Sequence, residues 1–122
     1  MIYRFNGDTG TNYSYATLDG DGVNTTTSNG INSNGFFGMA RVQMSSGIIY
    51  LDILDIFQYK NTGLFKTLLE QAAGAHSAAG GLTTQEVGLW RSTAAINSIS
   101  ITTSNGSFLS GTTATLYGIQ AA

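Results

Sequence analysis

GLWRSTAAINSISITTSNGSFLSGTTATLYGI, residues Gly88–Ile119, is the stretch that decides the fold class. It contains the only Trp of the chain and two β-type runs, residues 96–101 and 113–119. In the first run Ile96 falls on the opposite face from Ile99 and Ile101, which predicts a bend or bulge near Ser98, and alternation is regular from Ile99. The dipeptide Asn105-Gly106 between the runs is a strong turn signal. The turn-forming segment Ser104–Gly111 is too long to be the loop of a two-residue hairpin. The stretch therefore predicts two strands, the second a paired closing strand, joined by a wide connection.

Further β-type runs follow one another along the rest of the chain. They are separated by turns rich in Gly, Asn and Ser, which is typical of all-β domains. These runs are Ile2–Phe5, Tyr13–Leu18, Phe36–Met44, Ile48–Tyr59 and Leu82–Arg91. We therefore expect one domain over residues 1–122, an antiparallel β-sandwich of jelly-roll type with seven or eight short strands and at most one short helix.

The segment Leu64–Ala73 allows two interpretations. Its apolar residues recur at helical spacing, which favours a helix. The segment is short, however, and it is bracketed by Gly63 and Gly74 without a strong helix-capping residue. From the residues alone, helix and strand both remain open.

Residues 19–35 form the most polar part of the chain. Only Val23 and Ile31 in this segment are apolar, and the rest is dominated by Gly, Asn, Thr and Ser. This composition predicts a long surface loop, and long loops in compact domains often carry function. Four aromatic residues flank the segment and are candidates for contact with a partner or a glycan: Tyr13, Tyr15, Phe36 and Phe37.

Composition limits the classes of function that the chain can serve. Charged residues make up 10% of the chain, against roughly 25% in ordinary soluble domains. The net charge is −2 and the basic residues are scattered, so the chain lacks the basic patch of a nucleic-acid-binding protein. No apolar run approaches the roughly 20 residues of a membrane span, so we expect no membrane insertion. A surface with so few charges suits a permanent assembly.

The residues that could support catalysis do not form a recognisable pattern. His76 is the only histidine, it lies among small residues, and no nucleophile motif accompanies it. Asp52 and Asp55 lie three residues apart, which on a strand places them on opposite faces rather than around one bond. We interpret them as a solvent-facing and a strand-end carboxylate, predict no catalytic residue and expect a protein that is not an enzyme.

Metal and ligand sites were considered at two places. Asp19–Asn24 has oxygen ligands at alternate positions, as calcium loops do, but Gly30 stands where the twelfth-position Glu should be. Turn chemistry explains its Asx-Gly pairs without a metal, so we predict neither a metal nor a cofactor. Trp90 could stack on a sugar, but its alternation with Val87 and Leu89 favours a core or interface anchor.

Three segments in this order resemble a family of bacteriophage virion structural proteins found in tailed phages, including marine and cyanobacterial ones. They are NGDTGTNYSYATLDGDG (Asn6–Gly22), GLWRSTAAINSISI (Gly88–Ile101) and FLSGTTATLYGI (Phe108–Ile119). The pattern of the family is a strand ending in FNGDTGxNYS, then GLWRSTAAI, and a closing strand that ends in LYGI. The resemblance covers both ends of the chain.

The resemblance implies a non-enzymatic β-sandwich module on the surface of the virion, made in the host cytoplasm. Such modules decorate or stabilise capsids or form part of tail fibres. The expected partners are other virion proteins and further copies of the chain, with a homotrimer as the expected form. The alternative is a receptor- or carbohydrate-binding module of a tail fibre that serves host attachment.

Two more expectations come from the resemblance. Relatives carry a few dozen residues before the FNGDTG motif, including one or two strands, which are absent here. We therefore expect a shortened member, a fragment, or a chain whose missing strand a neighbour supplies. The relatives also have a strand after a Tyr-rich turn, which favours a strand for Leu64–Ala73.

Overall fold

The computed structural model describes residues 1–38, 49–76 and 80–119. These residues form seven strands and no helix, and every strand pairing is antiparallel. The strands are β1 (Ile2–Phe5), β2 (Tyr13–Gly20), β3 (Thr25–Ser33), β4 (Tyr50–Phe57), β5 (Lys66–His76), β6 (Gly80–Trp90) and β7 (Ile99–Thr102). The prediction of an all-β sandwich is confirmed, whereas the jelly-roll connectivity stays a prediction.

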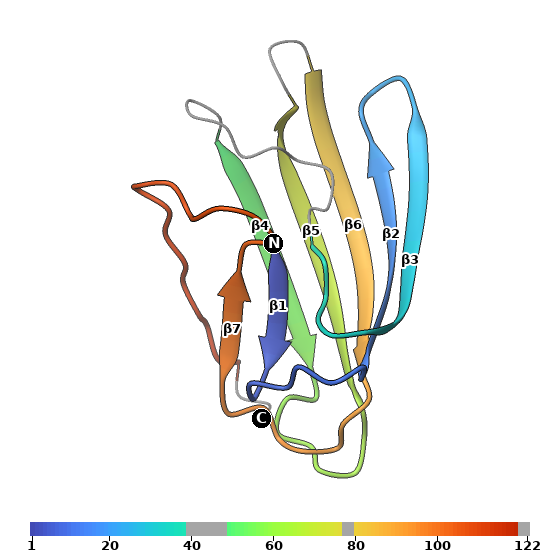
Figure 1. Cartoon of the computed structure of the whole chain (residues 1–122), viewed down its shortest axis with the longest axis vertical. Helices are drawn as coiled ribbons and strands as arrows, with labels where there is room; N and C mark the ends of the chain where they lie inside the picture. Colours follow the sequence, from blue (N-terminus) through green and yellow to red (C-terminus); the bar gives the residue numbers. More distant parts are fainter. Residues whose placement is uncertain (39–48, 77–79, 120–122) are drawn as a thin grey trace.

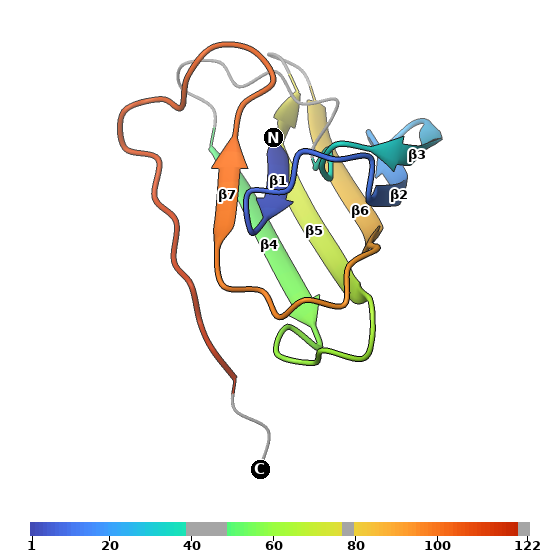
Figure 2. The same ribbon diagram turned by 60° about the horizontal axis from the view of Figure 1, so that its bottom comes forward.

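The two sheets are unequal in size. The large sheet has the strand order β3-β2-β6-β5-β4, and the small sheet consists of β1 and β7. Figures 1 and 2 show the small sheet on one face of the large sheet, with β7 toward the β4 side. An isolated bridge between Tyr3 and Phe36 adds to the free side of β1. We call the face of the large sheet that β1 and β7 cover the inner face, and the opposite one the outer face.

The ambiguous segment 64–73 is a strand for most of its length. β5 begins at Lys66, pairs with β6 over its whole length and pairs with β4 from Thr67 to Gly74. Leu68 is buried on the inner face, whereas its neighbour Leu69 faces outward. The helical spacing of the sequence arises because both faces of this strand carry apolar residues.

The prediction of a long surface loop over residues 19–35 is wrong. β2 continues to Gly20, and β3 returns antiparallel beside it as an edge strand. The turn between them is closed by Asp21, whose Oδ1 accepts hydrogen bonds from the backbone of Val23 at 2.9 Å and of Asn24 at 2.6 Å. An exposed edge strand needs no apolar alternation, and its Thr residues have high β-propensity. The polar composition of residues 25–33 is therefore the reason that the sequence did not predict a strand there.

The predicted closing strand over residues 113–119 does not form in the folded chain. β7 covers only Ile99–Thr102, and no strand follows it within the described residues. The large apolar side chains of the segment are more than three-quarters exposed, at 80% for Leu116, 83% for Tyr117 and 84% for Ile119. A strand was also predicted over Phe36–Met44; Phe36 forms only the bridge to Tyr3, and residues 39–44 lie outside the described part.

Gly88 allows the closest packing between the covering layer and the large sheet. A Cβ atom at this position would lie 2.4 Å from Cε1 of Phe36 and 2.9 Å from Cγ of Leu68. The Phe36 ring therefore rests directly on the backbone of β6. The absence of a side chain at Gly88 sets the distance at which the layers meet.

We expect Gly88→Ala to lower the free energy of unfolding by about 1–3 kcal/mol, because the added methyl group would force Phe36 and Leu68 from their places. Urea unfolding measures the change. Gly81→Ala is the matched control on the same strand, since its Cβ would meet nothing closer than 3.9 Å. Equal stability of the two variants would contradict this account of the layer contact.

Candidate functional site

The Asp8 carboxylate joins two of the sequence motifs. Asp8 Oδ2 accepts hydrogen bonds from Trp90 Nε1 at 2.7 Å and from Asn12 Nδ2 at 2.9 Å, and Oδ1 accepts one from the backbone of Gly10 at 2.8 Å. Burial alone would raise the pKa of Asp8, but these hydrogen bonds outweigh it and the pKa is lowered. The NGDTG turn therefore holds the indole of the second motif.

Two further side chains connect the same motifs. Asn6 Nδ2 donates to the carbonyl of Ala95 at 2.8 Å, and Asn6 Oδ1 accepts from the backbone of Asn97 at 2.8 Å. The Arg91 guanidinium donates to Ser14 Oγ and to the carbonyl of Thr11, at 2.5 and 2.6 Å. The polar residues of both motifs thus bind each other and form a structural junction.

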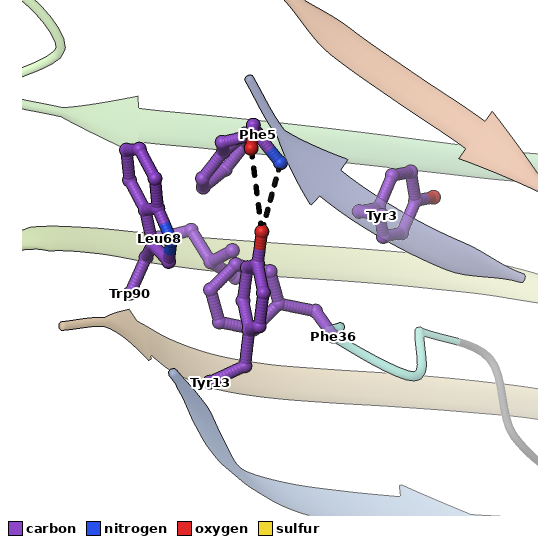
Figure 3. Packing of buried hydrophobic residues seen from close by; sticks show 6 residues of the cluster. All are labelled: Tyr3, Phe5, Tyr13, Phe36, Leu68 and Trp90. Atoms are coloured by element: carbon purple, nitrogen blue, oxygen red, sulfur yellow. Dashed lines mark hydrogen bonds between the residues drawn. The ribbon is translucent and has the colours of Figure 1, made fainter. Parts of the chain in front are cut away.

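An aromatic cluster lies directly behind this junction on the inner face. Phe5, Tyr13, Phe36 and Trp90 are in mutual contact, with ring centroids 5.0–6.5 Å apart. Figure 3 shows the rings converging from different segments, with the Tyr13 hydroxyl donating to the Phe5 carbonyl and accepting from the Phe5 backbone N–H. Trp90 is 2% exposed, so it is a core residue and not an open platform for a sugar.

Trp90→Ala should lower the free energy of unfolding by about 3–5 kcal/mol, since the substitution removes a large buried ring and leaves a cavity. Tyr117→Ala, at a ring that is almost fully exposed, should change stability by less than about 0.5 kcal/mol. Thermal and urea unfolding of both variants test the difference. A small loss at Trp90 with native-like melting would show that the cluster is not the core.

The four aromatic residues predicted to contact a partner or glycan do not form one surface. Tyr13 and Phe36 are fully buried in the cluster and cannot touch a ligand in this fold. Tyr15 and Phe37 are partly exposed and pack together, with ring centroids 5.8 Å apart. The prediction fails for Tyr13 and Phe36. The alternation of residues along a strand shows which side chains share a face, but it does not show which of the two faces the second sheet covers.

A second group on the inner face consists of carboxyl side chains. Glu70 and Glu86 are direct cross-strand partners on β5 and β6, and both are fully buried. Asp52 on β4 faces the same side and accepts a hydrogen bond from the Tyr3 hydroxyl. Neither Glu carboxyl has a hydrogen-bond partner among the described residues. Sequence reasoning missed the two Glu residues, although each lies two positions from an inward-facing residue, Leu68 and Gly88.

Burial determines the protonation of these carboxyls. Burial raises the pKa of Glu86 to about 8; the N-terminal ammonium of Met1 acts against this rise, and the Asp52 carboxylate adds to it. Burial also raises the pKa of Glu70, and the charges of Asp52 and Glu86 act in the same direction. Both Glu residues are therefore mostly protonated and neutral at pH 7, which lowers the cost of burying them on the inner face.

The raised pKa values predict that stability falls as the pH rises from about 4.5 to about 8. In this window the native state keeps protons that the unfolded state releases, so unfolding becomes easier with pH, by at most about 1.4 kcal/mol per pH unit for each carboxyl. Urea unfolding at several pH values measures the slope, and Glu70→Gln should reduce it. A slope that Glu70→Gln leaves unchanged would contradict the burial of a neutral Glu70.

The structure also places the residues considered for catalysis and metal binding. Asp52 and Asp55 do lie on opposite faces, but Asp52 faces inward, so its interpretation as a solvent-facing or strand-end residue is wrong. His76 ends β5, and its side chain lies outside the described part. Among the described residues, no three carboxylate or imidazole groups converge as metal ligands would. The Asp8 and Asp21 carboxylates accept hydrogen bonds from N–H groups within their own turns, as in Asx turns.

The outer face of the large sheet is the largest uncovered feature. Apolar side chains from three strands, β2, β6 and β4, point away from β1 and β7, and each is about half exposed: Leu18, Leu51, Ile53, Phe57 and Val87. On this face of β2, β4, β5 and β6, Asp55 is the only charged side chain. From a strand spacing of about 4.8 Å and a rise of about 3.4 Å per residue, these four strands offer roughly 500 Å² in projection. Single apolar residues on a surface are ordinary, whereas several that gather on one face of a sheet are a feature of interaction sites.

The comparisons with known proteins add no family. No protein-family model matches the chain, and no curated protein or solved structure matches it significantly. The resemblance of its motifs to phage virion proteins therefore stays a prediction. None of the described residues forms a helix that could cross a membrane.

Proposed function

We propose that this protein is a non-enzymatic structural subunit that assembles with copies of itself and with other virion proteins, and that it decorates or stabilises a phage particle. The observation that carries the proposal is the apolar outer face of the large sheet. A flat patch of roughly 500 Å² approaches the buried area of about 800 Å² per partner in stable protein interfaces. Its low charge means that two such faces meet with little electrostatic cost.

The polar groups of the described residues support the same function. The side chains of the two best-defined motifs bind each other, and Glu70 and Glu86 on the inner face are buried and mostly neutral near pH 7. These residues hold the two sheets together, as expected of a subunit whose task is mechanical.

Host attachment through a glycan is the alternative function, with less support from the geometry. Two of its four candidate residues, Tyr13 and Phe36, belong to the core. The partly exposed pair Tyr15 and Phe37 is what remains for it. Saturable glycan binding that is lost in Tyr15→Ala would favour attachment over the structural role.

Ile53→Asp should weaken self-association about tenfold or more, because it places a charge among the exposed apolar side chains that β4 contributes to the outer face. Light scattering over a range of concentrations gives the native mass. Val23→Asp is the matched control, since Val23 lies in the turn between β2 and β3 and is 90% exposed. Circular dichroism establishes that both variants fold.

Two results would count against the proposal. One is a native protein that stays monomeric at all accessible concentrations. The other is the absence of the chain from purified particles of the phage that encodes it, measured by quantitative mass spectrometry.

A further inference from the structure

The segment Thr113–Ile119, which we call the C-terminal arm, has the sequence of a strand without the pairing of one. Thr113 and Thr115 share one side of it with Tyr117 and Ile119, and its large apolar side chains are at least 80% exposed. Exposed apolar side chains on an extended backbone with unpaired N–H and C=O groups favour addition to a sheet edge. The arm therefore has the properties of a strand that lacks its sheet.

The small sheet has an open edge of the matching kind. β7 pairs with β1 on one side, and no described residue pairs with its other side. Tyr3 and Ile101 are direct partners in this sheet, yet Tyr3 is 3% exposed and Ile101 is 39% exposed. Ile101 is more exposed than Tyr3 because β7 is the outermost strand of the small sheet.

The inner face of the large sheet is also less completely covered near β7, on the side of β4. Inward-facing residues of β5 such as Leu68 and Glu70 are fully buried, whereas Leu54 and Ile56 on β4 are only partly buried. Figures 1 and 2 place β7 toward the β4 side of the large sheet. A strand added to the open edge of β7 would extend the small sheet in the direction in which cover is missing.

We propose that the C-terminal arm of a second copy of this chain adds to the open edge of β7 as a β-strand. This inference rests on the self-association proposed above and supplies a second contact for it. Strand addition would pair the backbone of the arm and cover Ile101 together with the β4 side of the inner face. No charged residue follows Arg91 in the sequence, so arm and edge meet without charge repulsion.

In the folded chain, the connection between β7 and the arm does not bring the arm into pairing with the chain's own β7. Thr103 Oγ1 donates to the carbonyl of Gly106 at 2.7 Å, and the backbone N–H of Thr112 donates to the carbonyl of Leu109 at 3.1 Å. These turns are followed by an arm that runs on the side of β7 facing away from β1 but forms no ladder with it (Figures 1 and 2). The folded chain thus presents the arm outward while its own edge stays open.

Cross-linking of mixed single-cysteine variants tests the contact directly, because the natural chain contains no cysteine. Ser100→Cys marks β7 and Thr115→Cys marks the arm. We expect a short flexible bismaleimide to join the two variants into a dimer when they are mixed. Ser107→Cys, in the exposed connection, replaces the arm variant as the control and should give little dimer.

Substitutions in the arm test its energetic role. Leu116→Asp and Tyr117→Asp change one residue on each side of the arm, so one of them must place a carboxylate against the neighbouring sheet. That variant should weaken association about tenfold or more, and the native mass should fall. Leu109→Asp is the same substitution outside the arm and should leave the native mass unchanged.

The outcomes separate this inference from the proposed function. A wild-type chain that never associates would overturn both. A chain that associates through the outer face, loses mass in Ile53→Asp and keeps it in both arm variants would overturn only the arm contact. A doubly substituted Ser100→Cys, Thr115→Cys chain that cross-links only within itself would show that the arm closes its own sandwich, and would also overturn the inference.

Discussion

The Asp8 carboxylate is the point on which the arrangement of the two sheets depends. It lies in the turn after β1 and binds the indole of Trp90 at the end of β6, so a single group joins the small sheet to the large one. Its other oxygen closes the turn through the backbone of Gly10. Hydrogen bonds to an ionised acceptor are among the stronger ones in proteins. Because Trp90 is part of the aromatic cluster, the hydrogen bond from its indole to Asp8 also helps to position the cluster.

The unequal width of the two sheets accounts for most other features of the inner face. Under β1 and Phe36 the large sheet is completely covered, and there it contains both the aromatic cluster and the paired carboxyls of Glu70 and Glu86. Toward β4 the cover thins, and side chains such as Ile56 stay partly exposed. Burying two carboxyl groups lowers stability, and the covered core tolerates them because both are in the neutral form.

The large sheet carries large apolar side chains on both faces, and this property links the fold to the proposed function. A sandwich that functions alone needs one apolar face per sheet, with polar residues outside. Here the outer face carries residues such as Ile53 and Val87, and the arm adds further apolar side chains. A surface with few charges provides little repulsion between copies. Assembly gives these residues a partner without requiring any catalytic group.

The sequence by itself determined the all-β class, the position of most strands and the structural character of Trp90, because alternation and turn residues act locally. The strand over residues 66–76 was uncertain, since apolar residues on both faces imitate helical spacing. Only the tertiary structure decided which face each strand buries, and therefore that Tyr13 and Phe36 are core while Ile53 is exposed. It also decided that residues 25–33 form an edge strand and that residues 113–119 stay unpaired. Pairing and burial depend on neighbours distant in sequence, and alternation carries no information about them.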